Sequence, residues 1–461
     1  MPLRTTFPIL LATLVACGSG DASNPVKDAF LEAPQEGELG APVAFRFPVR
    51  GGNDTKLYRL PDFEEVSWRF EASRSPAARV VGFAGDQDLI YLLSESGALV
   101  ALDLTSGRTR IVDTTVALAA MSPIGVPVLV RENGTVASVA YRTAVPWSTE
   151  FATLPQEIWV GARQRLIALV QGEDRTLELH ADGQSTITQS VPDGRLSVSR
   201  WGDVAAVATD SGVAFIDPSD PGAQQFLRLP DAPQFAVFSP SGHRLYVGSD
   251  GGALYDVDRF TQTVLDSLSL PGAAISASAD PWGRVLLLQP AVEDGVWIVD
   301  LAAWTLKGTV EGEWDAGLPL VGPDGSILVR RGDQVVSLSS DSLQIEGAIT
   351  DPRRDRWMVA AWDPRRPALE SAAQGERETQ QTGQIIYVQV SSTSNPDWAS
   401  DLAQNLDRAG MQASVLPPER EDDPYRVVLG PYPSREAAEA TRRRLNMPSW
   451  IFIQDTTQGR Q

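Results

Sequence analysis

The chain has 461 residues and a formal net charge of −20, with two histidines and one cysteine. An intramolecular disulfide is therefore excluded, and a zinc site built from nitrogen and sulfur ligands has too few candidates. A strongly acidic surface repels nucleic acid and anionic lipid headgroups, so neither is expected as a broad-surface partner. We expect no nucleic-acid partner, no metal and no cofactor.

Residues 1–17 have the organisation of an export signal. Arg4 precedes an apolar stretch from Phe7 to Val15, which is too short to span a bilayer as a mature helix. Small residues precede Cys17, and this pattern resembles the lipobox of bacterial lipoproteins. The resemblance implies a lipid on Cys17 that anchors the chain to a membrane of the cell envelope. An ordinary secretory signal with a coincidental cysteine is the alternative.

The residue after the cysteine bears on which membrane is reached. Gly18 stands where an Asp would retain a lipoprotein in the inner membrane. Its presence favours the outer membrane, with the chain facing the periplasm. Residues 18–50, rich in Gly, Ser, Pro, Ala and acidic residues, are expected to form a flexible tether.

Residues 51–362 consist of short runs of alternating apolar residues broken by turn signals, with little helical periodicity. The runs recur in a larger repeat of about 40 residues, which is the size of a four-stranded propeller blade. The two most similar copies begin at Arg79 and Gln234. The turn-strand-turn cadence resembles that of YVTN-type and WD-repeat propellers, a likeness that predicts fold and is silent on function.

We predict a mainly-β protein with about seven blades, and eight blades or two separate β domains are the alternatives. One of the segments flanking the repeats, 56–70 or 355–363, is expected to supply a strand to a mixed closing blade. Residues 363–384 lack aromatic and β-branched runs and are expected to be a disordered linker.

Residues 385–456 have a different pattern, with the order β-α-β-β-α-β. Strands are expected at 385–392, 412–417, 425–433 and 449–455, and amphipathic helices at 396–410 and 434–445. This order is the split βαβ arrangement, a small α+β domain of the RNP-like kind with both helices on one face of a four-stranded sheet. The opposite face of the sheet is then open for binding.

At these residues the sequence resembles the SPOR domain of bacterial envelope and division proteins. The shared motifs are Val-Gln-Val in the first strand, Tyr-Arg-Val-x-x-Gly-Pro-Tyr in the third, and Ser-Arg-Glu-x-Ala at the second helix. The resemblance implies binding to peptidoglycan, in particular to glycan strands stripped of their stem peptides at division septa. Ser391 and Thr393 depart from the family, which has Gly and Phe there, so a stacking platform for a sugar ring is missing at Thr393.

Strand alternation selects candidate binding residues. It places Gln389 and Ser391 opposite Val388 and Val390, and it separates Arg426 and Val428 from Val427 and Leu429. If Val388, Val390, Val427 and Leu429 pack under the helices, Gln389 and Arg426 lie on the opposite face. Their amide and guanidinium groups can then contact the glycan. The predicted peptidoglycan-binding residues are Gln389, Ser391, Ser392, Tyr425, Arg426 and Val428.

No catalytic constellation is evident. His180 and His243 lie beside turns within blades, without a Cys nucleophile or an elbow motif, and are expected to be structural. We therefore expect a non-catalytic lipoprotein whose propeller is a platform for an unknown protein partner. An outer-membrane assembly scaffold and a propeller enzyme acting on cell-wall sugars are the alternatives.

Overall fold

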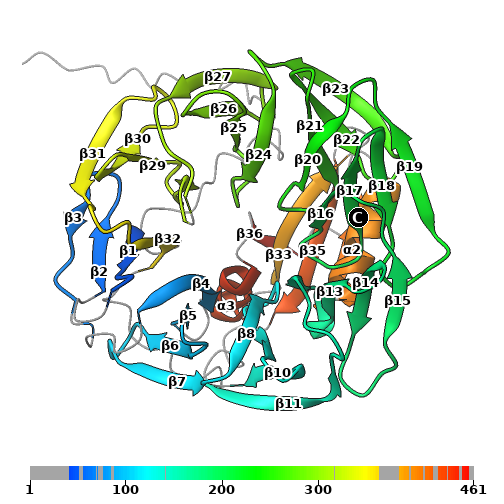
Figure 1. The fold of residues 1–461 in the computed structure, drawn as a ribbon, viewed down its shortest axis with the longest axis horizontal. Helices are drawn as coiled ribbons and strands as arrows, with labels where there is room; N and C mark the ends of the chain where they lie inside the picture. The colour runs from blue at the N-terminus through cyan, green and yellow to red at the C-terminus, as the bar shows by residue number, and fades with distance from the viewer. Residues whose placement is uncertain are drawn as a thin grey trace, which may run out of the picture.

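The computed structural model describes residues 41–50, 55–68, 70, 76–84, 88–140, 142–315, 317–362, 384–393, 396–408, 411–418, 424–432, 434–445 and 449–455. Eight four-stranded antiparallel sheets in this part of the chain are arranged as a ring of blades, and a ninth sheet lies beyond them in sequence (Figure 1). The expected export signal, Cys17 and most of the predicted linker lie outside the described residues.

The blades are numbered in chain order. Blade 1 contains β1 (Pro42–Phe47), β2 (Lys56–Arg59), β3 (Glu64–Glu65) and β32 (Arg356–Ala361). Blade 2 contains β4 (Ala77–Ala84), β5 (Leu89–Ser94), β6 (Leu99–Asp103) and β7 (Thr109–Asp113). Blade 3 contains β8 (Val116–Met121), β9 (Pro127–Arg131), β10 (Thr135–Ala140) and β11 (Thr143–Glu150). Blade 4 contains β12 (Glu157–Val160), β13 (Leu166–Gln171), β14 (Arg175–His180) and β15 (Ile187–Ser190), with a 3₁₀ turn η1 (Ala162–Gln164).

The other four blades follow the same scheme. Blade 5 contains β16 (Arg195–Val198), β17 (Ala205–Thr209), β18 (Gly212–Ile216) and β19 (Gln224–Arg228). Blade 6 contains β20 (Pro233–Phe238), β21 (Arg244–Ser249), β22 (Ala253–Asp258) and β23 (Thr263–Ser269). Blade 7 contains β24 (Ala274–Ala279), β25 (Val285–Pro290), β26 (Val296–Asp300) and β27 (Thr305–Val310). Blade 8 contains β28 (Leu320–Val321), β29 (Ile327–Arg331), β30 (Gln334–Leu338) and β31 (Ile345–Thr350).

The position of a strand in its blade determines its pattern of burial. The second strands, such as β5 and β13, are almost wholly buried, because each is covered by blades on both sides. The outermost strands, such as β11 and β23, are mostly exposed and lie on the circumference of the ring (Figure 1). The apolar runs that marked the repeats in the sequence are therefore the middle strands of each blade.

The ring is closed by a mixed blade, as predicted. The segment after the last repeat supplies β32, which pairs along its whole length with β1 from the start of the described chain. The blade count is eight, one more than the predicted seven, because the segments flanking the repeats build a complete blade together. Since β1 begins at Pro42, the propeller also starts earlier than residue 51, inside the range expected to be tether.

The C-terminal domain has the predicted order of elements. It contains β33 (Gln384–Thr393), α2 (Pro396–Arg408), β34 (Ala413–Leu416), β35 (Tyr425–Tyr432), α3 (Arg435–Leu445) and β36 (Trp450–Asp455). The strand order in the sheet is β34-β35-β33-β36, so the first strand lies at the centre. Ser434 is an N-cap of α3, since its hydroxyl accepts a hydrogen bond of 3.2 Å from the Ala437 amide.

Candidate functional site

The two faces of the C-terminal sheet differ as strand alternation predicted. Val388 and Val390 of β33, and Val427 and Leu429 of β35, belong to one buried apolar cluster with α2 and α3. Each of these four side chains is at most 5 % exposed. Gln389 is paired with Val428, and it lies on the opposite side of the sheet, which we call the outer face. Arg426 shares that face, two residues from Val428.

A β-bulge changes the position of the two serines. Gln389 pairs with Val428, but the next pair is Ser391 with Val427, so β33 has one extra residue there. The prediction that Ser391 shares a face with Gln389 is therefore wrong. Ser392 is the residue opposite Arg426. Simple alternation failed here because it assumes that no residue is inserted into the strand.

Tyr425 also lies away from the outer face. It pairs with Thr393 and packs against the apolar cluster under the helices. The missing aromatic at Thr393 thus falls on the same side of the sheet as Tyr425, and a Phe there would not extend the outer face. Of the predicted binding residues, the structure brings together Gln389, Ser392, Arg426 and Val428 on the outer face.

Gln389 occupies the centre of the outer face. The residue is 1 % exposed. Among the residues that the structure describes, none donates a hydrogen bond to its Oε1. A buried amide oxygen that lacks a donor has a desolvation cost of about 1–3 kcal/mol. Such a group is suited to accept a hydrogen bond from a ligand hydroxyl or amide.

Aromatic side chains lie near this glutamine on the β36 side of the sheet, and the sequence reasoning did not identify them. Trp450 of β36 pairs with Gln389, and Phe452 pairs with Tyr387. The Tyr387 and Phe452 ring centroids are 6.4 Å apart, and the guanidinium carbon of Arg426 lies 4.9 Å from the Phe452 centroid. The alternation Trp-Ile-Phe-Ile in β36 was the available signal, because it separates two aromatic side chains from two aliphatic ones.

The helix side of this domain contacts the propeller. Trp398 of α2 lies edge-on to His243, with ring centroids 4.7 Å apart. Trp201 belongs to the apolar cluster of the C-terminal domain, and its indole nitrogen donates a 3.2 Å hydrogen bond to the Ser241 carbonyl. Arg200 donates to the Leu445 carbonyl at the end of α3. The propeller residues named here lie in turns that join the first and second strands of blades 5 and 6.

This contact affects ionisation. Burial lowers the pKa of His243 to about 4, and the nearby Arg244 and Arg259 act in the same direction, against Asp258. Burial likewise lowers the pKa of Arg200 to about 10. His243 is thus neutral at ordinary pH and packs as an aromatic group, which agrees with its predicted structural role. The other histidine, His180, contacts Glu178 and the Phe151 ring within the propeller.

A cavity of about 360 Å³ opens inside the ring near the same turns. Its walls are the ends of the innermost strands β4, β8, β12 and β16, with Phe83, Met121, Trp159 and Arg200 among the lining side chains. Among the described residues, no group of three or more His, Cys, Asp or Glu side chains is arranged to hold a metal ion. No described helix is long and apolar enough to cross a membrane.

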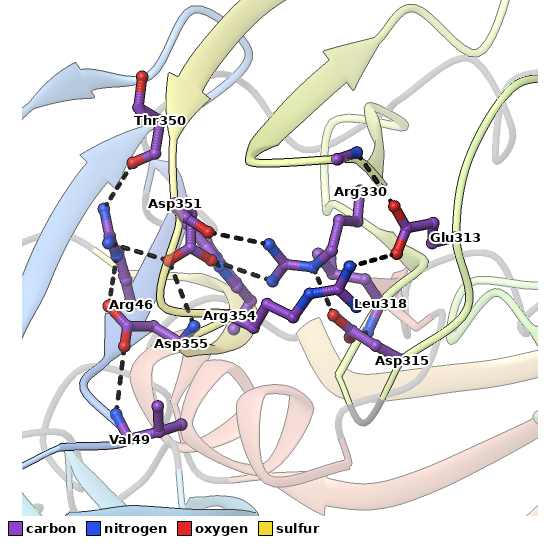
Figure 2. A network of polar contacts seen from close by, with 12 residues as sticks. Arg46, Val49, Glu313, Asp315, Leu318, Arg330, Thr350, Asp351, Arg354 and Asp355 are labelled. Atoms are coloured by element: carbon purple, nitrogen blue, oxygen red, sulfur yellow. Dashed lines mark hydrogen bonds and ion pairs between the residues drawn. The ribbon is translucent and has the colours of Figure 1, made fainter.

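The propeller also contains a buried ionic network where the ring closes (Figure 2). Arg46 of β1 contacts Asp351 at 2.9 Å and Asp355 at 2.8 Å, and Arg330 contacts Asp351 at 3.0 Å and also Asp315. Arg330 and Asp351 are fully buried. Because each charge is neutralised by a neighbour, this cluster ties blade 8 to blade 1 and is structural rather than a ligand site.

Residues 382–452 match the family model described as "SPOR domain". No curated protein is similar enough to the chain to match. Among solved structures, the dihydro-heme d1 dehydrogenase NirN in complex with DHE has 13 % identity and a TM-score of 0.51, over 70 % of this chain and 74 % of that one. Apo AztD from Citrobacter koseri has 10 % identity and a TM-score of 0.48, over 70 % of this chain and 100 % of that one. At this identity the likeness concerns the fold alone. The chain thus combines a β-propeller-like domain of eight blades with a C-terminal SPOR domain.

Proposed function

We propose that the chain binds glycan strands of peptidoglycan on the outer face of its SPOR sheet, and that the strands it prefers are those stripped of stem peptides at division septa. The SPOR domain itself implies peptidoglycan binding and a location in the cell envelope. The observation that supports the finer proposal is Gln389, whose buried amide oxygen lacks a donor among the described residues and which pairs with Trp450 of β36.

The chemistry of the outer face suits such a strand. A glycan without peptides displays hydroxyls, acetamido groups and lactyl carboxylates. Gln389 offers an amide that can accept and donate, and Arg426 offers a cation for a carboxylate. Phe452, Tyr387 and Trp450 provide apolar rings of the kind that stack against the C–H face of a sugar. A stem peptide is attached through the lactyl carboxyl as an amide, so its removal frees the carboxylate and should favour binding to Arg426.

We further propose that Cys17 carries a lipid and that the chain is held in the outer membrane, facing the periplasm. The support is the signal-like segment that ends in Leu-Val-Ala-Cys. Multiple acyl chains would give a stable anchor, because each buried CH₂ contributes about 0.8 kcal/mol. The lipid and the SPOR domain would then connect a membrane to the wall.

For the propeller we propose a binding platform for a protein partner, without catalysis. The contact with the SPOR domain occupies turns on one side of the ring, so a partner would use the opposite side or the circumference. An assembly scaffold of the outer membrane is a variant of this role. An enzyme acting on wall sugars is the alternative from another class, and it would use the cavity beside Trp159 and Arg200.

Sedimentation with purified peptidoglycan tests the wall-binding proposal. The full chain should sediment with the wall, and more of it should do so after an amidase has removed the peptides. Gln389→Ala should reduce the bound fraction, whereas Gln404→Ala, at an exposed position of α2, is the matched control that should not. Equal sedimentation of the two folded variants would contradict the assigned face.

A further inference from the structure

Arg426 and Phe452 contact each other from the two strands that flank the strand of Gln389. Arg426 lies on β35 and Phe452 on β36, and β33 lies between these two strands. Gln389 pairs with Val428 on one side and with Trp450 on the other. Arg426 precedes Val428 by two residues and is opposite Ser392, while Phe452 follows Trp450 by two and is opposite Tyr387. Measured along β33, Arg426 therefore lies beyond one end of the Gln389 position and Phe452 beyond the other.

The guanidinium can reach the Phe452 ring only diagonally across the sheet. Its carbon lies 4.9 Å from the ring centroid, a distance typical of a cation–π contact. The line between the two residues crosses β33 at the row of Gln389. A glutamine on the solvent side of a small sheet would ordinarily be accessible, yet this one is 1 % exposed. Val428, which pairs with Gln389, is 0 % exposed as well, and the Arg426 guanidinium reaches across this row to the Phe452 ring.

From this geometry we propose that Arg426 is a lid over the glycan site, closed on Phe452 in the free protein and displaced when a glycan strand binds. The inference rests on the proposed binding of glycan to the outer face. Opening releases three groups at once. The Gln389 amide becomes available to sugar hydroxyls, the face of Phe452 becomes available to a sugar ring, and the guanidinium becomes available to a lactyl carboxylate.

The free energies involved allow such an exchange. A cation–π contact at a solvent-accessible site is weak, so a ligand that replaces it with a carboxylate and a stacked ring can displace it. The unsatisfied Oε1 of Gln389 favours the open state once a hydroxyl donor is present. A ligand lacking the carboxylate would leave the guanidinium without a new partner, so the lid also selects for stripped, carboxylate-bearing strands.

The test uses the full chain labelled with ¹⁵N at the arginine Nε, with the Arg426 signal assigned from its loss in Arg426→Lys. In the free protein the Arg426 Nε–H proton should resonate upfield of ordinary arginines, because it lies over a ring face. Phe452→Leu should remove that displacement. Tyr387→Leu, which changes the neighbouring ring on the same face, is the matched control and should leave it in place.

Soluble amidase-stripped glycan fragments are then added. The expected result is a downfield shift of the Arg426 signal that saturates with bound glycan. If sedimentation shows binding while this signal keeps its upfield position, the lid is overturned and the proposed function stands. If no glycan binds, the proposed function fails and the lid fails with it. An ordinary Arg426 shift in the free protein also overturns the lid.

Discussion

The Trp398 indole of the SPOR domain and the His243 imidazole of the propeller pack edge-on at 4.7 Å, joining two domains that are far apart in the sequence. In this position burial lowers the pKa of the His243 imidazole to about 4, so the ring is neutral at ordinary pH. A SPOR domain held in this way has its helix side on the propeller and its outer face on the other side of the sheet. The orientation of the proposed wall-binding face is thus set by the propeller.

The contact should weaken in acid. The pKa of His243 is lower in the folded chain than its ordinary value of 6.5, so the contact is fully stable above that value. The free energy of unfolding should fall as pH decreases from about 6.5 to about 4, by at most about 1.4 kcal/mol for each pH unit. Thermal unfolding followed across this range should show the loss, and His243→Asn should flatten it. An identical pH profile for the variant would contradict the assignment.

Removal of the Trp201 indole should separate the domains. Trp201→Ala removes a side chain 2 % exposed that lies in the apolar cluster of the SPOR domain, a change that typically costs about 3–5 kcal/mol. Hydrogen exchange should rise in α2 and in the β16–β17 turn while the other blades stay protected. Trp147→Ala, on the outermost strand β11, is the comparison variant and should leave α2 protected.

Loss of packing under the SPOR helices should affect folding but not the outer face. Val427 is 0 % exposed and points into the apolar cluster, so Val427→Ala should lower the free energy of unfolding by about 2 kcal/mol. Urea titration measures this loss. At low temperature the folded variant should sediment with peptidoglycan as the native chain does, in contrast to Gln389→Ala. A binding defect in the fully folded Val427 variant would show that Val427 lies on the outer face, contrary to its assignment under the helices.

The ionic network at the ring closure should be sensitive to loss of its central acid. Asp351 accepts from Arg46, Arg330 and the Trp357 indole, so Asp351→Ala leaves two largely buried cations short of a partner. Breaking a buried pair in this way typically costs about 3–5 kcal/mol. Glu64→Ala breaks an exposed pair with Arg59 and should cost less than about 1 kcal/mol. Chemical denaturation compares the two, and equal losses would show that the network does not hold the ring together.

The proposed anchor can be tested independently of the fold. Cys17→Ala should abolish incorporation of labelled palmitate and move the chain from the membrane fraction to the soluble fraction. The variant should still bind purified peptidoglycan, because the SPOR domain is distant in sequence from Cys17. Continued labelling of the variant would exclude lipidation at this residue.

Local patterns in the sequence determined the domain order, the blade repeat, the closing strand and the two faces of the SPOR sheet. These features follow from turn chemistry and from the two-residue period of a strand, both of which act over a few residues. Gln389, Val428 and Arg426 could be assigned to one face for that reason. Blade 1 was harder to count, because its strands come from both ends of the repeat region.

Only the tertiary structure decided the details that depend on neighbours distant in sequence. The bulge after Gln389 is a property of the pairing between β33 and β35, so alternation within β33 could not reveal that Ser391 changes face. The approach of Arg426 to Phe452 depends on a strand that lies between them in the sheet but not in the sequence. The burial of His243 under Trp398 likewise depends on packing between domains, which no local pattern of side chains encodes.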